Sequence, residues 1–178
     1  AKDVSRLEPQ LVCAGALWSP TSGIIDVHAY MDALQRDLED RCGVIAFNSP
    51  VSSGIIEGGR IRLSIADKDE TDISCQIMIN AAGLNAPHVA ASIKNRRNKI
   101  VPPRLLAKGT YCVLKRTSPF AHLVYPAPHG VHASLDLGGQ LRFGPDSEWT
   151  DEIDYRLDEA RIAPFYEKIR AFWPDLRD

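Results

Sequence analysis

The stretch that most constrains the fold runs from Gln76 to Ala86, where a short apolar segment leads through two alanines into Gly83. An apolar run followed directly by small residues and a helix-compatible segment predicts a buried strand that turns sharply into a helix. Glycine adopts positive φ and has no Cβ, so a ligand can approach Gly83 closely, and a helix beyond it offers free N–H groups to an anion. The plainer alternative is that Gly83 only lets the strand and the helix pack together.

The clearest helix prediction lies between Asp26 and Gly43. Its apolar residues recur at helical spacing: Val27, Tyr30, Met31, Leu34 and Leu38. Asp26 stands at the N-cap position, and Gly43 is the expected C′ residue. Before the helix, the apolar run Leu11–Trp18 ends in turn-forming residues and is predicted to be a strand.

Beyond Gly43 the period changes from helical to extended. Strands are predicted at Val44–Phe47, Val51–Glu57, Arg60–Ala66 and Ser74–Ala81. Gly58-Gly59 is expected to form a hairpin turn, residues 67–72 a polar loop, and Leu84–Ser92 a helix with Pro87 in its first turn. This order of elements is typical of an α/β or α+β protein.

The second half of the sequence is predicted to form a sheet followed by a helix. Strands are predicted at Leu105–Leu114, His122–Tyr125, Val131–Leu137 and Gln140–Phe143. Short connections cannot carry parallel crossovers, so this sheet is expected to be mainly antiparallel. The tail from Asp158 to Trp173 is predicted to be helical, with Pro164 either kinking the helix or starting its main part. The predicted fold class is α+β.

Composition excludes several classes of function. The net charge is −2 over 178 residues, and Lys and Arg are dispersed, so nucleic acid is not an expected partner. The four cysteines lie far apart in the sequence and match neither a metal-binding nor a redox motif. We therefore expect reduced thiols, no metal and a cytoplasmic location. Apolar runs stay below membrane-spanning length.

Polar residues that could carry chemistry follow the strands of the second half. They are Lys108, Tyr111, His122, Tyr125, His132, Asp136 and Arg142. An Arg holds a carboxylate bidentately and a His accepts a proton near neutral pH, so a surface formed by these residues suits a small organic acid. The alternative is that each is an ordinary sheet residue, and that Asp136 with Gly138-Gly139 makes a turn. The phosphate-binding pattern G-x-G-x-x-G does not occur in the sequence.

Several motifs together resemble one enzyme family. They are Leu7–Pro9, Gly15–Pro20, Gly23–Asp26, Ile79–Leu84, Leu106–Tyr111, Leu123–Pro128, Gly130–His132 and Arg142–Asp146. In this order, over nearly the whole chain, they resemble the D-amino-acid-oxidase-like family of FAD-dependent oxidoreductases, and most closely its L-2-hydroxyglutarate dehydrogenase and oxidase branch.

The resemblance assigns three segments of the chain to different domains. Residues 1–42 would supply a strand and a helix of the substrate domain, 43–92 part of the FAD-binding domain, and 93–178 the antiparallel substrate sheet and the C-terminal helix. Val51, Ala81, Ala82 and Gly83 would meet the cofactor. By analogy, a 2-hydroxy acid would lose a hydride to the flavin, with His132 or His122 as base, Tyr111, Arg142 and Tyr125 near the substrate, and Lys108 as an electrostatic aid.

The sequence also departs from the family. Relatives start with a glycine-rich phosphate loop and finish with a glycine- and arginine-containing segment, and neither is found here; the Pro128–Gly130 connection is also short. We therefore expect a fragment that binds FAD weakly or not at all and is inactive alone. Two alternatives stay open: an amine or amino-acid oxidase of the same family, and a non-catalytic module that self-associates through open sheet edges.

Overall fold

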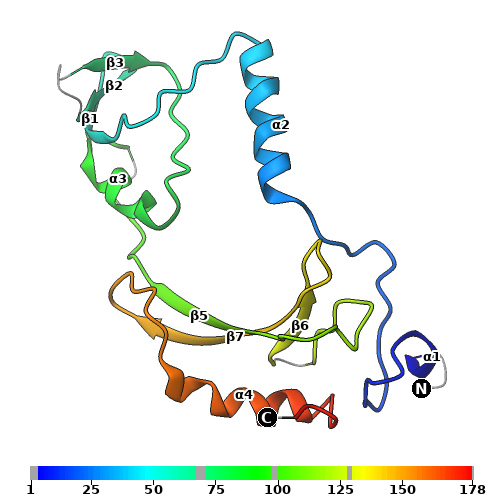
Figure 1. The fold of residues 1–178 in the computed structure, drawn as a ribbon. Helices are drawn as coiled ribbons and strands as arrows, with labels where there is room; N and C mark the ends of the chain where they lie inside the picture. Colours follow the sequence, from blue (N-terminus) through cyan, green and yellow to red (C-terminus); the bar gives the residue numbers. More distant parts are fainter. Residues whose placement is uncertain (1–3, 67–70, 98–99, 128–129, 178) are drawn as a thin grey trace. The chain divides into compact units, whose positions relative to one another are not determined.

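The chain forms two compact units (Figure 1). The computed structural model describes residues 4–66, 71–97, 100–127 and 130–177. The terminal unit comprises Ala1–Gln35 and Ala107–Asp178, and the middle unit comprises Arg36–Leu106. The described residues contain four α-helices, one mixed sheet and one antiparallel sheet. Most of the loop predicted at 67–72, and Pro128-His129 in the short connection, lie outside the described residues.

The middle unit is built on a four-stranded sheet with the order β3-β2-β1-β4. Its strands are β1 (Val51–Glu57), β2 (Arg60–Ile65), β3 (Asp72–Cys75) and β4 (Ile93–Lys94). The predicted β1–β2 hairpin is confirmed: Gly58 and Gly59 have φ of 57° and 76°, as a type I′ turn requires. β4 runs parallel to β1, with Gly54 paired to Ile93. A Cβ on Gly54 would lie 2.7 Å from the Ile93 Cδ1 atom, so glycine allows β4 to approach.

Two predicted strands of the middle unit are wrong. Val44–Phe47 has no strand structure, and β3 ends at Cys75 instead of continuing to Ala81. Ile77 and Ile79 are 80% and 86% exposed, so the segment before Gly83 is not buried. A strand needs a partner for its backbone N–H and C=O groups, and none of the described strands pairs with either segment.

The helix after Gly83 is confirmed. A 3₁₀ turn, η1 (Gly83–Asn85), leads into α3 (Ala86–Ser92), and a proline occupies the first turn of α3. Gly83 has φ of 55°, a left-handed conformation that favours glycine. The corner into the helix therefore exists, although an extended segment rather than a strand precedes it.

The N-terminal part contains α1 (Val4–Leu7) and α2 (Val27–Asp40). The predicted cap of α2 is confirmed, because the Ala29 N–H donates to the Asp26 carboxylate at 3.0 Å. The C-terminal prediction is shifted by one residue: Cys42, with φ of 61°, takes the left-handed position, and the Gly43 N–H donates to Leu38 O as in a Schellman motif. Leu11–Trp18 is not a strand, since no described strand runs beside it.

The terminal unit is built on the antiparallel sheet β5-β7-β6. Its strands are β5 (Leu106–Val113), β6 (His132–Leu135) and β7 (Leu141–Thr150). β7 continues seven residues past the predicted end at Phe143. The predicted strand at His122–Tyr125 is reduced to one bridge between Val124 and Ala133. The reason is a long-range contact: the N–H groups of Ala121 and His122 donate to the Glu8 carboxylate and not to a neighbouring strand.

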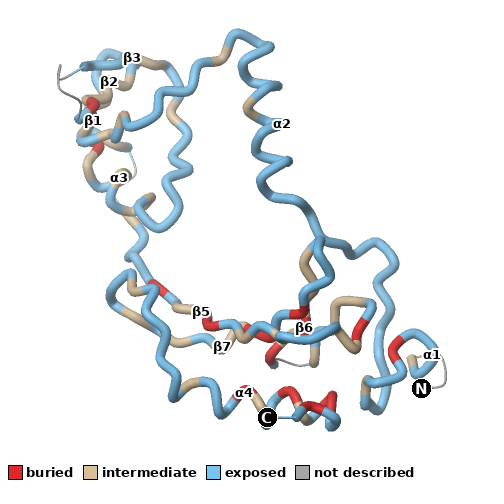
Figure 2. The backbone as a smooth tube through the Cα atoms, in the orientation of Figure 1, coloured by how far each residue is buried: buried red, intermediate tan, exposed pale blue. Residues whose placement is uncertain are grey.

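One face of this sheet is covered by α4 (Ala163–Arg170), which follows the 3₁₀ turn η2 (Glu159–Arg161). Pro164 lies in the first turn of α4, so it starts the helix and does not kink it. Ten buried residues of this unit form one hydrophobic cluster, coloured red along the sheet and the C-terminal segment in Figure 2: Phe120, Val131, Ala133, Leu141, Phe143, Phe165, Ile169, Phe172, Trp173 and Leu176. None of the helices in the described residues is long and apolar enough to cross a membrane.

Candidate functional site

The face of the β5-β7-β6 sheet that α4 does not cover gathers most of the predicted substrate residues. Side chains alternate along a strand, so the buried Ala133 and Phe143 leave His132 and Gly144 on the opposite face. His132 pairs with Gly144 in the β6–β7 register. We call this surface, formed by Tyr111, Tyr125, His132, Arg142 and Gly144, the open face.

Gly144 determines where the Tyr111 ring lies. A Cβ at position 144 would be 2.4 Å from the Tyr111 Cδ1 atom and 2.8 Å from the Thr110 carbonyl oxygen. The ring therefore occupies the space above β7 that a side chain would fill. Tyr111 remains 50% exposed, so its other side is accessible to a ligand.

Tyr125 is the next aromatic residue along the open face. The Val124–Ala133 bridge sets Tyr125 beside His132, and their ring centroids are 4.3 Å apart at 48°. Three rings therefore lie in one row across the sheet: Tyr111, which lies over Gly144, then His132 and then Tyr125. The structure thus brings together residues that lie up to 21 positions apart in sequence.

Arg142 lies on the open face two residues before Gly144. Its Nη2 donates to the Asp136 Oδ2 at 3.1 Å, and the Asp136 Oδ1 accepts the N–H groups of Gly138 and Gln140 at 2.9 Å each. The Gln140 N–H, followed by those of Gly138 and Arg142, lowers the pKa of Asp136. The turn predicted for Asp136 is confirmed. About half of the Arg142 side chain, 49%, stays exposed and available to a carboxylate.

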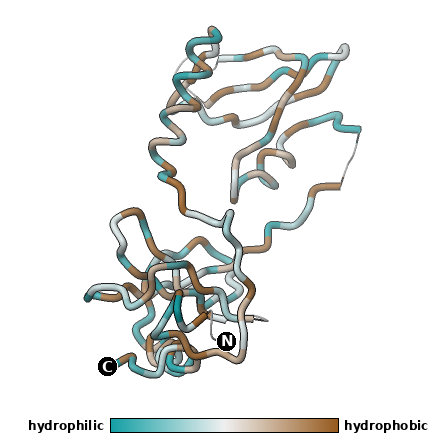
Figure 3. The backbone as a smooth tube through the Cα atoms, turned by 90° about the vertical axis from the view of Figure 1, so that its right-hand side faces the viewer, coloured by the Kyte–Doolittle hydropathy of each residue, from teal (hydrophilic) through white to brown (hydrophobic). Residues whose placement is uncertain are grey.

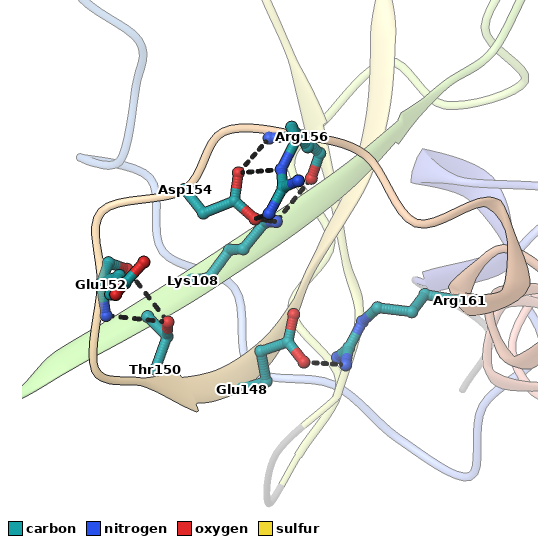
Figure 4. A network of polar contacts seen from close by, with 7 residues as sticks. All are labelled: Lys108, Glu148, Thr150, Glu152, Asp154, Arg156 and Arg161. Atoms are coloured by element: carbon teal, nitrogen blue, oxygen red, sulfur yellow. Dashed lines mark hydrogen bonds and ion pairs between the residues drawn. The ribbon is translucent and has the colours of Figure 1, made fainter.

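Lys108 lies on the other face of the sheet from Tyr111. The two lie three positions apart on β5, an odd number, so strand alternation directs them to opposite faces. The Lys108 ammonium donates to the Arg156 carbonyl oxygen and lies 3.7 Å from Asp154 (Figure 4). The hydrogen bonds from Arg156 lower the pKa of Asp154, and Lys108 adds to the shift. Lys108 thus contacts the segment after β7, and its role as an electrostatic aid to the substrate stays a prediction.

His122 is held by a residue to which the sequence assigned no role. The Glu8 carboxylate is buried, 5% exposed, and its Oε1 lies 2.7 Å from the His122 Nδ1. The Trp18 ring meets the His122 ring edge-on, with centroids 5.0 Å apart. Because an ionised carboxylate only accepts hydrogen bonds, the His122 Nδ1 is the donor toward an ionised Glu8.

The predicted cofactor residues belong to the middle unit. Val51 begins β1 and pairs with Ile65. At the corner, the Asn80 side chain donates to the Ala86 carbonyl oxygen at 2.8 Å and accepts from the Ala82 N–H at 3.3 Å. No atom lies within 4 Å of a Cβ built on Gly83. This bare, left-handed corner fits the close approach of a cofactor, although no phosphate loop occurs in the sequence.

Other features of the described residues do not compete as sites. No group of three metal-ligating side chains occurs among them. A cavity of about 760 Å³ lies between β5 and α4, on the covered side of the sheet. Sequence reasoning missed Glu8 and Gly144. Both residues lie within motifs of the family resemblance, Leu7–Pro9 and Arg142–Asp146, but those motifs assigned them no role. Only the tertiary contacts show what each residue does.

Comparison with known proteins agrees with the motifs. The model of the FAD dependent oxidoreductase family (DAO) matches residues 1–178. The mitochondrial L-2-hydroxyglutarate dehydrogenase of Arabidopsis thaliana is 32% identical over 99% of this chain and 46% of its own length. The mitochondrial L-2-hydroxyglutarate dehydrogenase of Caenorhabditis briggsae (32% identical) and the L-2-hydroxyglutarate dehydrogenase of Escherichia coli K12 (23% identical) each match 83% of this chain and 36% of their own lengths.

This chain therefore spans less than half the length of the curated relatives that it matches. The plant alignment extends over 220 residues, more than the 178 present here, so it contains positions that this chain lacks. The family match covers the whole chain, including both the sheet with the open face and the Gly83 corner. The chain belongs to the FAD-dependent oxidoreductase family.

Proposed function

We propose that the open face is the substrate surface of an FAD-dependent oxidoreductase that oxidises a small 2-hydroxy acid, similar to L-2-hydroxyglutarate, to the 2-oxo acid. The observation that carries this proposal is the row of Tyr111, His132 and Tyr125 on one exposed sheet face, with Arg142 beside it. The names of the relatives support the choice of a 2-hydroxy acid over an amine.

The side chains of the open face divide the work of the reaction. Arg142 holds the substrate carboxylate, and the Tyr111 hydroxyl adds a hydrogen bond to it. His132, as the neutral imidazole, takes the proton of the α-hydroxyl while the α-carbon loses a hydride and the C=O bond forms. FAD, when bound, supplies the hydride acceptor. His132 is favoured over His122 as the base because it shares a face with Tyr111 and Arg142, whereas His122 is engaged by Glu8.

The cofactor contacts in this chain come from the middle unit. The Ala81–Gly83 corner offers small residues and free space for the cofactor, and Val51 lies at the start of β1. The chain alone is expected to bind FAD weakly, because its sequence contains no glycine-rich loop to hold the diphosphate.

The reaction is tested in a hybrid protein. This chain replaces the matching segment of the Arabidopsis relative, so that the remaining segments of that protein complete the flavin site. The hybrid is mixed anaerobically with L-2-hydroxyglutarate, with shorter 2-hydroxy acids, and with glycine and sarcosine. Bleaching of the flavin absorbance by hydroxy acids is the expected result. Bleaching by the amines alone would overturn the proposal in favour of an amino-acid oxidase.

The assignment of the base is tested in the same hybrid. His132→Gln is expected to lower kcat by about 10²- to 10⁴-fold with flavin content unchanged, as for loss of a general base. His28→Gln, at an exposed position on α2, is the matched control and should leave kcat unchanged. If His122→Gln lowers kcat in this way and His132→Gln does not, the base is His122.

A further inference from the structure

We propose that Glu8 is a positioning residue of the open face, because it holds Tyr125 against His132 through the loop Ser118–Leu123. This inference rests on the function proposed above, in which the Tyr125–His132 pair faces the substrate. It gives a role to the Leu7–Pro9 motif, whose residues are remote in sequence from the sheet.

The Glu8 carboxylate is buried, and within the described part of the chain its hydrogen bonds go to one loop. Its Oε1 accepts the N–H of Ala121 at 2.9 Å and the N–H of His122 at 2.7 Å, and it also meets the His122 Nδ1 at 2.7 Å. A buried ionised carboxylate is tolerated only with such partners. The 5% exposed Glu8 therefore fixes the backbone of two consecutive loop residues, 113 and 114 positions away.

The rest of the loop leaves little freedom for compensation. The Ser118 hydroxyl donates to the Phe120 carbonyl oxygen at 2.7 Å and accepts the Phe120 N–H at 3.0 Å. The Phe120 ring, 3% exposed, is held in the core against Phe172 and Trp173. The loop is thus fixed at Phe120 by the core and at Ala121 and His122 by Glu8.

Only two residues, Leu123 and Val124, separate His122 from Tyr125 of the aromatic pair. After His122, the Val124 N–H donates to Ala133 O at 2.8 Å, and the Ala133 N–H donates back at 2.9 Å. This bridge is isolated, without the neighbouring rungs of a regular ladder. An isolated bridge depends on the chain that leads into it. Release of Ala121 and His122 from Glu8 is therefore expected to loosen the bridge and to move Tyr125 off His132.

The test uses NMR spectroscopy of the 178-residue protein, without flavin or substrate. The Tyr125 ring, 4.3 Å from His132, shifts the His132 ring protons by its ring current. In Glu8→Ala these protons are expected to move toward their positions in an unfolded peptide. The Val124 amide is expected to exchange about ten- to a hundredfold faster, as for the loss of buried hydrogen bonds to a charged group.

Two further variants make the result specific. Glu8→Gln keeps a carbonyl oxygen for the N–H groups but loses the charge, so a partial shift of the His132 protons is expected. Arg6→Ala, at an exposed position in α1, is the matched control and should leave them in place. If Glu8→Ala unfolds the sheet, as reported by loss of the Leu141 and Phe143 signals, Glu8→Gln decides the question.

The inference is overturned if the His132 protons stay in place in Glu8→Gln, and in a folded Glu8→Ala, while the Ala121 and His122 amides move. That outcome would limit the role of Glu8 to attaching the N-terminal segment to the loop. None of these readouts involves flavin reduction, so failure of the hydroxy-acid reaction in the hybrid protein would be seen separately.

Discussion

The terminal and middle units have similar amounts of sheet but different means of support. Every member of the buried cluster belongs to the terminal unit, where α4 supplies a second layer over the sheet. In the middle unit, Ile65 and Ile93 are buried, whereas Ile73, Ile77 and Ile79 are exposed. Figure 3 shows hydrophobic stretches, in brown, in both parts of the chain. Apolar content alone therefore does not decide where a core forms.

The difference teaches what a second layer contributes. A sheet buries an apolar face only when another element packs against it. In the terminal unit, side chains from α4 and the C-terminal segment fill that role. In the middle unit, α3 contacts β1, but most of the contacts come from strand pairing, with glycine at the turns and at the close approach of β4 to β1. Packing of buried side chains supports the sheet of the terminal unit, whereas hydrogen bonds between strands are the main support of the sheet in the middle unit.

The largest effect is expected from Trp173→Ala. Trp173 is 1% exposed and stacks on Phe143 with centroids 6.0 Å apart, so the cavity should cost the terminal unit about 3–5 kcal/mol. Hydrogen exchange should show lost protection at Leu141 and Ala133, with little change in β1 and β2. Equal loss in both units would mean that they unfold together, and the comparison would fail.

A smaller effect is expected from Gly54→Ala in the middle unit. The new Cβ would meet the Ile93 and Leu63 side chains at 2.7 and 2.9 Å, an overpacking that should cost about 1–3 kcal/mol. The loss should appear as faster exchange in β1 and β4, with the terminal unit unchanged. Gly15→Ala, where a Cβ meets no atom within 4 Å, is the control. Wild-type protection in Gly54→Ala would show that β4 is not held by close packing.

An ion-pair cluster in the terminal unit should make its stability depend on pH. Lys168, at 2.9 Å, and Arg161 lower the pKa of Asp146 below its ordinary value of 3.8. Since the folded state binds the proton less tightly, the stabilisation is complete above the unfolded pKa and is lost as pH falls through the folded pKa. Asp146→Asn should lower the free energy of unfolding by about 1–2 kcal/mol at neutral pH. It should also weaken the loss of stability at acidic pH, which we call the acid limb.

Urea unfolding followed by tryptophan fluorescence at neutral and acidic pH measures the effect. Asp37→Asn, which removes an exposed partner of Arg41 on α2, is the control and should leave the acid limb unchanged. An acid limb as steep in Asp146→Asn as in the original protein would assign the dependence to other carboxylates.

The smallest effect, with the opposite sign, is expected from Cys42→Gly. Cys42 holds φ of 61° at the end of α2, a conformation that costs an L-residue about 1 kcal/mol more than glycine. The change should stabilise that helix end by about this amount, measured as slower exchange of the Gly43 amide. Cys13→Gly, at an exposed position outside any helix, should show no gain. Faster exchange at Gly43 would contradict a backbone origin of this cap.

Local signals predicted some elements well. Asp26 and the apolar spacing after it define α2, and Gly58-Gly59 defines the β1–β2 hairpin, because capping and turn chemistry act within a few residues. The strands predicted at Leu11–Trp18 and Val44–Phe47, and the part of the predicted strand Ser74–Ala81 beyond Cys75, are absent for the opposite reason. An apolar segment becomes a strand only beside a partner, and its own residues do not specify one.

The sequence by itself determined the family, the amphipathic helix, the tight turns and the residue types of the candidate site, since these depend on motifs and on short-range backbone preferences. Only the tertiary structure decided which of those residues meet. Strand parity separated Lys108 from Tyr111, the β6–β7 register put His132 opposite Gly144, and a carboxylate from the N-terminal segment captured His122. Such juxtapositions are set by long-range pairing and burial, which no local pattern encodes.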